Sequence, residues 1–302
     1  MSPEGFLNLL KPPGMTSHDV VAMVRRRLGL RRIGHLGTLD PAAAGVLPVA
    51  LGRATRLFEF AAGPDKVYRA EVVFGITTDT LDGEGEVSAE GDSSALGEDD
   101  LAAMTHSFVG EIEQTPPAYS AVSVGGRRLH ELAREGVTVK ARPRRVEIMS
   151  IDVVEFSPGR RARAVLDVVC GGGTYIRALA ADLGKAAGCG AYLGFLVRTR
   201  VGRFELSQAL TLEKLGAGDE EDGAKEALLP VDFPLAHLAA VRLEAEAGGK
   251  FLHGGQVLTK AAAGYPVRVY GPDERLLGLG EVLTNGRLRP RVVIASDEDV
   301  GR

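Results

Sequence analysis

One stretch of this sequence, Ile33–Leu47, limits the fold more than any other. It holds a single acidic residue, Asp40, among small and apolar residues, together with three glycines and a proline. Because Asp40 precedes Pro41, its backbone is disfavoured in the helical region. Gly37 and Gly45 permit positive φ or a close approach of the backbone. The stretch therefore predicts a rigid loop that presents one carboxylate in a partly desolvated pocket.

Asp40 also has a purely structural interpretation. It could cap a helix that begins at Pro41, since aspartate is favoured at the cap and proline at the first helical position. The local pattern leaves both interpretations open, because the start of a helix is also a place to present a carboxylate.

A second glycine-rich turn, 171–173, precedes a predicted helix at Thr174–Leu183, for which Thr174 is a plausible N-cap. The turn lacks the spacing of a P-loop or of a dinucleotide fingerprint, so nucleotide binding is a weak interpretation. Arg177 would lie in the first turn, the unfavourable end of the helix dipole for a cation. We therefore expect an anionic partner, and a buried bidentate pair with a carboxylate would supply it.

The remaining pattern indicates a large domain followed by a small one. The length of 302 residues exceeds what one hydrophobic core usually organises. Thr16 and Asp19 predict a capping box for an amphipathic helix that Gly29 ends. From about residue 238, short strands separated by glycine and proline turns predict a small β domain. The larger strands are expected near 6–11, 66–77, 146–155, 162–170 and 192–202.

The net charge of −4 conceals an uneven distribution. Bases outnumber acids by five in residues 1–70 and by seven in 116–210, whereas 71–115 contain twelve acids and no base. This distribution permits a basic face for phosphates beside an acidic edge. A basic insertion at about 122–146 suits a loop that closes on a phosphate backbone, although an exposed loop without a ligand has the same composition.

Composition also sets expectations for the cellular location and for the cysteines. No apolar run approaches the roughly 20 residues of a membrane span, and the first residues do not resemble a signal peptide, so we expect a cytoplasmic protein. Cys170 and Cys189 have no Cys-x-x-Cys partner, which predicts buried free thiols rather than a metal site or a disulfide.

Six motifs occur together in an order and spacing that resemble the TruB family of bacterial tRNA pseudouridine-55 synthases. The resemblance covers about residues 6–210 well, and beyond 238 a looser one to the small RNA-binding PUA module follows. The motifs are Lys11–Asp19, Gly34–Pro41, Lys66–Tyr68, Pro117–Ala121, Gly173–Arg177 and Phe195–Arg200.

This resemblance implies an α+β fold with a mixed, largely antiparallel central sheet and flanking helices, followed by a small β-rich PUA-like domain. It implies a catalytic domain at 1–235, in which the insertion at 122–146 closes on RNA, and an RNA-binding domain at 238–302. The expected partner is the T-arm stem-loop of tRNA. A monomer without membrane, cofactor, metal or obligate protein partner is expected.

The resemblance also implies roles for individual residues. Asp40 matches the catalytic aspartate, and Arg177 matches its ion-pair partner. His35 matches the residue that takes the place of the flipped base, and Tyr68 matches the tyrosine that stacks on the target base. Tyr175 and Leu196 match pocket positions. Ala42 and Ala44 depart from the larger or hydroxylated residues common there, which affects packing behind the aspartate.

The implied reaction converts uridine 55 of the T-arm loop from an N1-glycoside to a C5-glycoside after the base is flipped out. It needs a positioned, ionised carboxylate, either as nucleophile on the sugar or as base in a route through a glycal, and the sequence does not choose between them. Two alternatives stay open. One, which the basic segments and the terminal β module motivate, is an RNA chaperone that folds tRNA with or without catalysis. The other is a guide-RNA-dependent enzyme within a protein complex, which the short chain without long basic tails disfavours.

Overall fold

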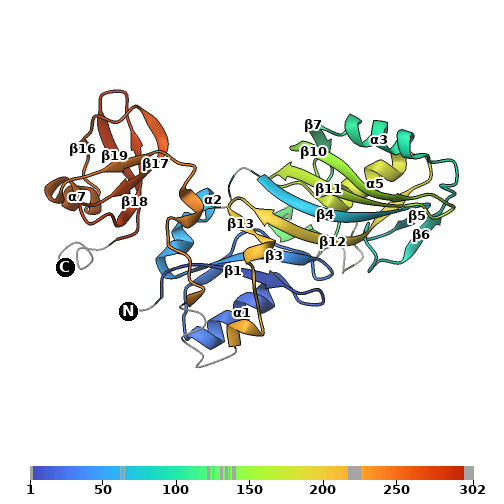
Figure 1. The fold of residues 1–302 in the computed structure, drawn as a ribbon, viewed down its shortest axis with the longest axis horizontal. Helices are drawn as coiled ribbons and strands as arrows, with labels where there is room; N and C mark the ends of the chain where they lie inside the picture. Colours follow the sequence, from blue (N-terminus) through green and yellow to red (C-terminus); the bar gives the residue numbers. More distant parts are fainter. Residues whose placement is uncertain are drawn as a thin grey trace.

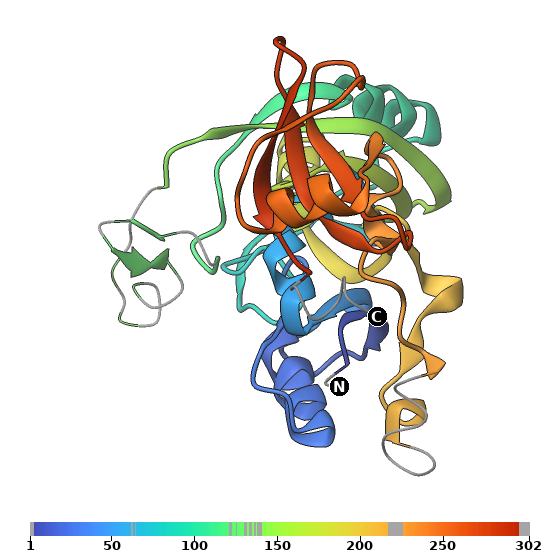
Figure 2. The ribbon, with the colours of Figure 1, turned by 90° about the vertical axis from the view of Figure 1, so that its left-hand side faces the viewer.

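The computed structural model describes residues 3–61, 63, 65–120, 123–124, 126–129, 132, 135, 137, 141–216 and 226–295. Much of the predicted insertion at 122–146 therefore lies outside the described residues. Two of its strands are described, β8 (Ser123–Val124) and β9 (Arg127–Arg128). They project from the body of the molecule as a short hairpin (Figure 2).

In the described part of the chain, ten strands form one mixed sheet, which runs through the larger part of the molecule (Figure 1). Its main path is β14-β1-β3-β12-β4-β11-β10-β7, with β2 on β3 and β13 on β12. The β1/β14 and β3/β12 pairs are parallel and the other described pairs are antiparallel. This arrangement confirms the predicted α+β class. The strands are β1 (Gly5–Lys11), β2 (Ile33–His35), β3 (Ala44–Leu51), β4 (Asp65–Phe74), β7 (Gly110–Gln114), β10 (Arg144–Ser157), β11 (Arg163–Gly171), β12 (Ala191–Val201), β13 (Phe204–Glu205) and β14 (Leu210–Thr211).

Helices pack on the sheet and bury apolar side chains of its strands. Helix α1 (Ser17–Leu28) buries Val20 and Val24 against β1 and β3, and the expected capping box and left-handed Gly29 are both present. Helices α3 (Glu98–Ser107) and α5 (Ile176–Ala186) pack on the half of the sheet that contains β4, β11 and β12 (Figure 1). The shorter elements are η1 (Gly52–Leu57), α2 (Phe58–Ala61), β5 (Ile76–Thr78), β6 (Val87–Glu90), η2 (Leu206–Gln208), η3 (Lys214–Gly216) and η4 (Phe233–Leu235).

Gly45 allows β3 and β12 to lie side by side immediately after the Asp40 loop. Its φ is +117°, and a Cβ at this position would lie 2.2 Å from the carbonyl oxygen of Arg198. Only glycine fits this space, because any other side chain would collide with the backbone of β12. The close approach fixes the Asp40 loop against the centre of the sheet.

The C-terminal residues form a separate β domain with its own core, at one end of the molecule (Figure 1). Its described sheet has the order β15-β17-β18-β19-β16, and it carries a helix that the sequence patterns did not predict. Leu279 and Ile294 of this domain pack with Phe6 and Phe204 of the larger one. The elements are β15 (Ala240–Arg242), α7 (Ala245–Leu252), β16 (Val257–Leu258), β17 (Gly264–Tyr270), β18 (Leu276–Val282) and β19 (Arg287–Val293).

Three local expectations were wrong. No helix begins at Pro41, since the chain passes through a bend into strand β3, so Asp40 is not a helix cap. Helix α5 begins at Ile176, and Thr174 instead donates a hydrogen bond from its hydroxyl to the Gly171 carbonyl. Cys170 and Cys189 are both free, but only Cys170 is fully buried.

Candidate active site

The loop that carries Asp40 is held by side chains from three separate elements. The Lys11 ammonium, at the end of β1, donates hydrogen bonds to the carbonyl oxygens of Pro41 at 3.1 Å and Ala43 at 2.7 Å. The Ser17 hydroxyl, at the start of α1, accepts from the Leu39 amide and donates to its carbonyl. With the polar groups of the loop paired in this way, its backbone has little freedom to move.

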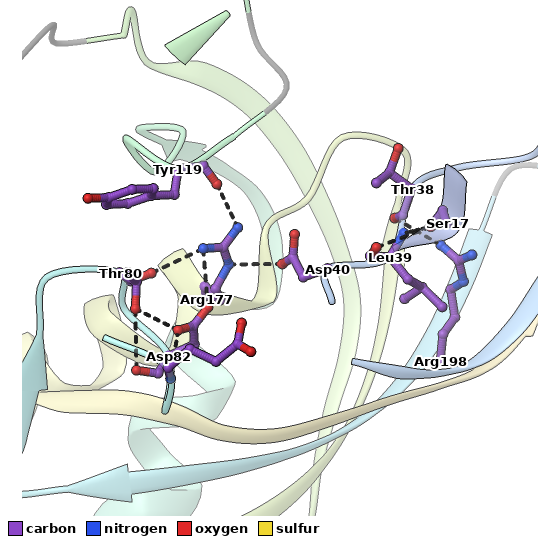
Figure 3. A network of polar contacts seen from close by, with 10 residues as sticks. Ser17, Thr38, Leu39, Asp40, Thr80, Asp82, Tyr119, Arg177 and Arg198 are labelled. Carbon is purple, nitrogen blue, oxygen red and sulfur yellow. Dashed lines mark hydrogen bonds and ion pairs between the residues drawn. The ribbon is translucent and has the colours of Figure 1, made fainter. Parts of the chain in front are cut away.

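Arg198 on β12 adds to this support. Its guanidinium, fully buried on β12, donates to the carbonyl oxygens of Gly37 at 3.0 Å and Thr38 at 3.4 Å, and also to that of Val46. Figure 3 shows Arg198 beneath Thr38 and Leu39 of the loop. In the same view the Asp40 carboxylate points away from Arg198, toward Arg177. The result is a carboxylate held in a fixed direction.

Asp40 points toward Arg177, in the first turn of α5, and shares that arginine with a second carboxylate. The Nε atom of Arg177 lies 2.9 Å from Oδ2 of Asp40, and its Nη1 atom lies 3.3 Å from Oδ2 of Asp82. The Arg177 side chain is only 6% exposed and that of Asp82 only 11%, whereas solvent still reaches Asp40, so the pair with Asp82 is the more buried of the two. The predicted anionic partner is therefore present, but the geometry is a bridge between two carboxylates and not a bidentate pair with one.

The turn after β5 fixes Asp82 on the far side of Arg177. Oδ1 of Asp82 accepts from the Thr80 hydroxyl at 2.5 Å and from the Glu84 amide at 3.1 Å. Arg177 also donates to the backbone carbonyls of Thr80 and Tyr119 (Figure 3). These contacts satisfy a cation at the N-terminus of a helix, where the dipole alone disfavours it.

The pKa of Asp40 lies above its ordinary value. Partial burial in the recess is the largest cause, although 39% of the side chain is accessible to solvent. The positive charge of Arg177 acts in the opposite direction and the negative charge of Asp82 acts with burial. Arg177 thus limits a rise in the pKa that burial would otherwise make larger.

Five of the six predicted site residues line a single cavity of about 250 Å³. Asp40 and Arg177 form one wall, and the other three come from β4, the start of α5 and β12. These three are Tyr68, Tyr175 and Leu196. Burial raises the pKa of Tyr68, which keeps its phenol neutral near pH 7.

The position of Tyr175 is set through its backbone. Gln114, the last residue of β7, accepts from the Tyr175 amide at 3.0 Å and donates to its carbonyl at 3.3 Å. The guanidinium carbon of Arg144 lies 4.7 Å from the centre of the Tyr175 ring, within the range of a cation–π contact. Gln114 therefore fixes the backbone of Tyr175, and Arg144 contacts the face of its ring.

His35 lines a larger neighbouring cavity of about 650 Å³, which also includes Asp40 and Arg177. Burial lowers the pKa of His35, and the nearby charge of Arg198 lowers it further. The imidazole is therefore neutral near pH 7. Each of the other five predicted residues lines a cavity that Asp40 also lines, and the individual roles of all six stay predictions.

Sequence reasoning missed several residues that build this site. Asp82 stood in an acidic loop with no sign that it would meet Arg177, and Lys11 and Ser17 belonged to a matched motif without a role of their own. For Lys11 a signal was available, because a lysine in an otherwise apolar strand must find acceptors if it is buried. Among the described residues no group of three or more His, Cys, Asp or Glu side chains is arranged to hold a metal ion.

Replacing Lys11 by methionine is expected to lower the free energy of unfolding by roughly 1 to 3 kcal/mol, because it removes the buried hydrogen bond from Lys11 to the Ala43 carbonyl. Methionine fills a similar volume, so the loss reflects the hydrogen bonds. Denaturant unfolding measures it, and Lys250→Met, which removes an exposed lysine paired with Glu246 on α7, is the control. An equal, small change in both variants would contradict this role for Lys11.

The same variant gives a dependence on pH. Burial lowers the pKa of Lys11 from 10.5 to about 8. Between these values the unfolded chain binds a proton that the native lysine has released, so this group makes the native state more stable as the pH rises. The stability of the wild type relative to Lys11→Met should therefore increase from pH 8 to 10.5.

The chain matches models of known protein families along nearly its whole length. Residues 25–176 match the model described as "TruB family pseudouridylate synthase (N terminal domain)". Residues 177–236 match "tRNA pseudouridylate synthase B C-terminal domain", and residues 239–294 match "Pseudouridine synthase II TruB, C-terminal".

Named relatives and solved structures agree with these matches. The tRNA pseudouridine synthase B of Symbiobacterium thermophilum is 56% identical over 83% of this chain and 82% of its own length. The tRNA pseudouridine synthase B of Moorella thermoacetica is 47% identical over 95% of this chain and 94% of its own length. The fold is similar to a chain in the crystal structure of a Cbf5-Nop10-Gar1 complex, with a TM-score of 0.74, 28% identity and coverage of 99% of this chain and 87% of that one.

Proposed function

Since this chain belongs to the TruB family of pseudouridylate synthases, we propose that it converts uridine 55 in the T-arm loop of tRNA to pseudouridine. The observation that carries the proposal is the cavity of about 250 Å³ in which one carboxylate meets two tyrosines and a leucine. A flipped pyrimidine base needs a space of this kind, with aromatic faces for stacking and an acid beside the sugar.

In the proposed reaction the N1–C1′ bond of the uridine breaks, the base turns within the cavity, and a C5–C1′ bond forms while the C5 proton leaves. Asp40 acts either as nucleophile on C1′ or as base in a route through a glycal, and both routes need its ionised form. Arg177 favours that form by its positive charge. Tyr68 stacks on the target base, Tyr175 and Leu196 border it, and His35 takes its place in the loop.

Flipping the base costs a few kcal/mol, which stacking and phosphate contacts would offset. The predicted basic insertion at 122–146 and the C-terminal β domain, for which we propose bounds of 238–302, are the parts proposed to supply such contacts. No helix of the described residues is long and apolar enough to cross a membrane. We propose that the chain acts as a monomer on tRNA in the cytoplasm.

Site-resolved mapping of pseudouridine on tRNA tests this function. Purified protein incubated with unmodified tRNA, without guide RNA or other proteins, is expected to introduce pseudouridine at position 55. Modification at another position would contradict the proposed substrate site. Modification only after a protein partner or guide RNA is added would favour the complex-dependent alternative instead.

A further inference from the structure

Two cationic side chains meet at Gly37, in the loop ahead of Asp40. A Cβ built on Gly37, whose φ is +81°, would lie 3.3 Å from Nζ of Lys66 and 3.4 Å from Nη1 of Arg198. The ammonium and the guanidinium therefore face the same small space. The missing side chain of Gly37 is what leaves room for both.

No carboxylate of the described residues balances this pair of charges. Arg198 donates to backbone carbonyls, and the side-chain ammonium of Lys66 makes no hydrogen bond or ion pair with any described residue. Asp65, the neighbouring acid, pairs with Arg200 at 2.5 Å. The pKa of Lys66 is lowered, first by burial and then by Arg198. Two partly desolvated like charges are costly, and an anion between them would remove that cost.

Lys66 faces the cavity that contains Asp40. Lys66 and Tyr68 are two positions apart on β4, so their side chains lie on the same face of the sheet. Both line the cavity of about 250 Å³, as does Gly37. The unbalanced charge is therefore presented to whatever enters this cavity.

Resting on the proposed function, we propose that Lys66 binds a phosphate group that flanks the target uridine, with Arg198 adding to the positive potential. The ligand that balances the charge must be anionic when it binds, which a phosphate is and a neutral uracil is not. Lys66 is thus a substrate-binding residue that fixes the sugar of the flipped nucleotide relative to Asp40. The anionic subsite lies at Gly37, between Lys66 and Arg198.

The test compares two proteins in their binding to a T-arm stem-loop. Both carry Asp40→Asn to prevent turnover, and one of them also carries Lys66→Met. The substitution is expected to weaken binding roughly tenfold and to lower the slope of log affinity against log salt by about 0.7. Lys185→Met is the matched control, because Lys185 is exposed in the last turn of α5, at the opposite end from the cavity. It should leave both the affinity and the slope unchanged.

Two modified RNAs identify the contact. Each carries one uncharged methylphosphonate linkage, on the 5′ or the 3′ side of the target uridine. One of them is expected to weaken binding by the Lys66 protein about as much as Lys66→Met does, and to have no further effect on the Lys66→Met protein. Methylphosphonate effects of equal size in both proteins would overturn the proposal. It would also be overturned if Lys66→Met left RNA binding unchanged but slowed turnover in a protein that retains Asp40.

Thermal unfolding separates this role from a structural one. Lys66→Met removes a repulsive charge beside Arg198, so its melting temperature without RNA is expected to equal or exceed that of the wild type. A clear loss of stability would show that Lys66 is needed by the fold and would count against the subsite. Modification of unmodified tRNA by the wild type checks the proposed function independently, so a failure of either proposal can be recognised.

Discussion

Asp40→Asn is expected to abolish release of the C5 hydrogen from the target uridine, with a loss in rate of at least about a thousandfold. Asparagine has nearly the same shape, but it cannot act as an anionic nucleophile or as a base. It also keeps an oxygen that faces Arg177, so the loop should stay in place. Tritium release from C5-labelled uridine in a T-arm stem-loop measures the effect.

RNA binding should survive the same substitution, because the basic segments and the other cavity residues are unchanged. Asp152→Asn, at an exposed position of β10, is the matched control and should keep full activity. Full activity of the Asp40→Asn variant would contradict the proposed catalytic role of Asp40. If the variant is inactive on uridine but still accelerates the folding of tRNA, the two activities are separable and the chaperone alternative gains support as a second function.

Arg177→Met is expected to lower the rate by about a hundredfold to a thousandfold while also destabilising the protein. The substitution leaves Asp40 and Asp82 near each other without the cation between them. Breaking a fully buried ion pair costs about 3 to 5 kcal/mol. The cavity admits water to Asp40, so roughly 2 to 3 kcal/mol is expected for the free energy of unfolding.

The pH–rate profile separates an electrostatic role of Arg177 from simple loss of structure. The charge of Arg177 lowers the pKa of Asp40 against the effect of burial, so its removal raises that pKa. Activity that needs the carboxylate is lost as the pH falls through this pKa. The acidic limb of the profile should therefore move to higher pH in Arg177→Met, and the variant should regain part of its rate in more alkaline buffer.

An exposed arginine–aspartate pair provides the control for this variant. Arg69 on β4 pairs with Asp167 on β11 through two hydrogen bonds of 2.8 and 2.7 Å, and half of the Arg69 side chain is exposed. Arg69→Met should leave the stability almost unchanged, because an exposed ion pair contributes little, and it should leave the pH profile unshifted. An Arg177→Met profile that matches that of Arg69→Met would contradict the proposed electrostatic role.

Much of the fold could be predicted from local pattern. Thr16, Asp19 and Gly29 specify the ends of α1 through contacts within a few residues. The alternation of apolar and polar residues specified strands such as β4. The predictions that failed needed information from elsewhere in the chain. Pro41 does not begin a helix, because Ala44–Leu51 pairs as a strand with Gly5–Lys11 and its apolar side chains are buried there. That burial outweighs the local preference of an Asp-Pro sequence.

For the candidate site, the sequence by itself determined which acid to predict as the functional one, because Asp40 is the only acid in its stretch and its backbone is restrained by Pro41. It also indicated that Arg177 needs an anion. Only the tertiary structure decided that two carboxylates share this arginine and that Lys66 and Arg198 face one space at Gly37. These groups are brought together by strand pairing and burial between residues up to 161 positions apart. Charge balance in such a place depends on distance and lost hydration, which local sequence does not specify.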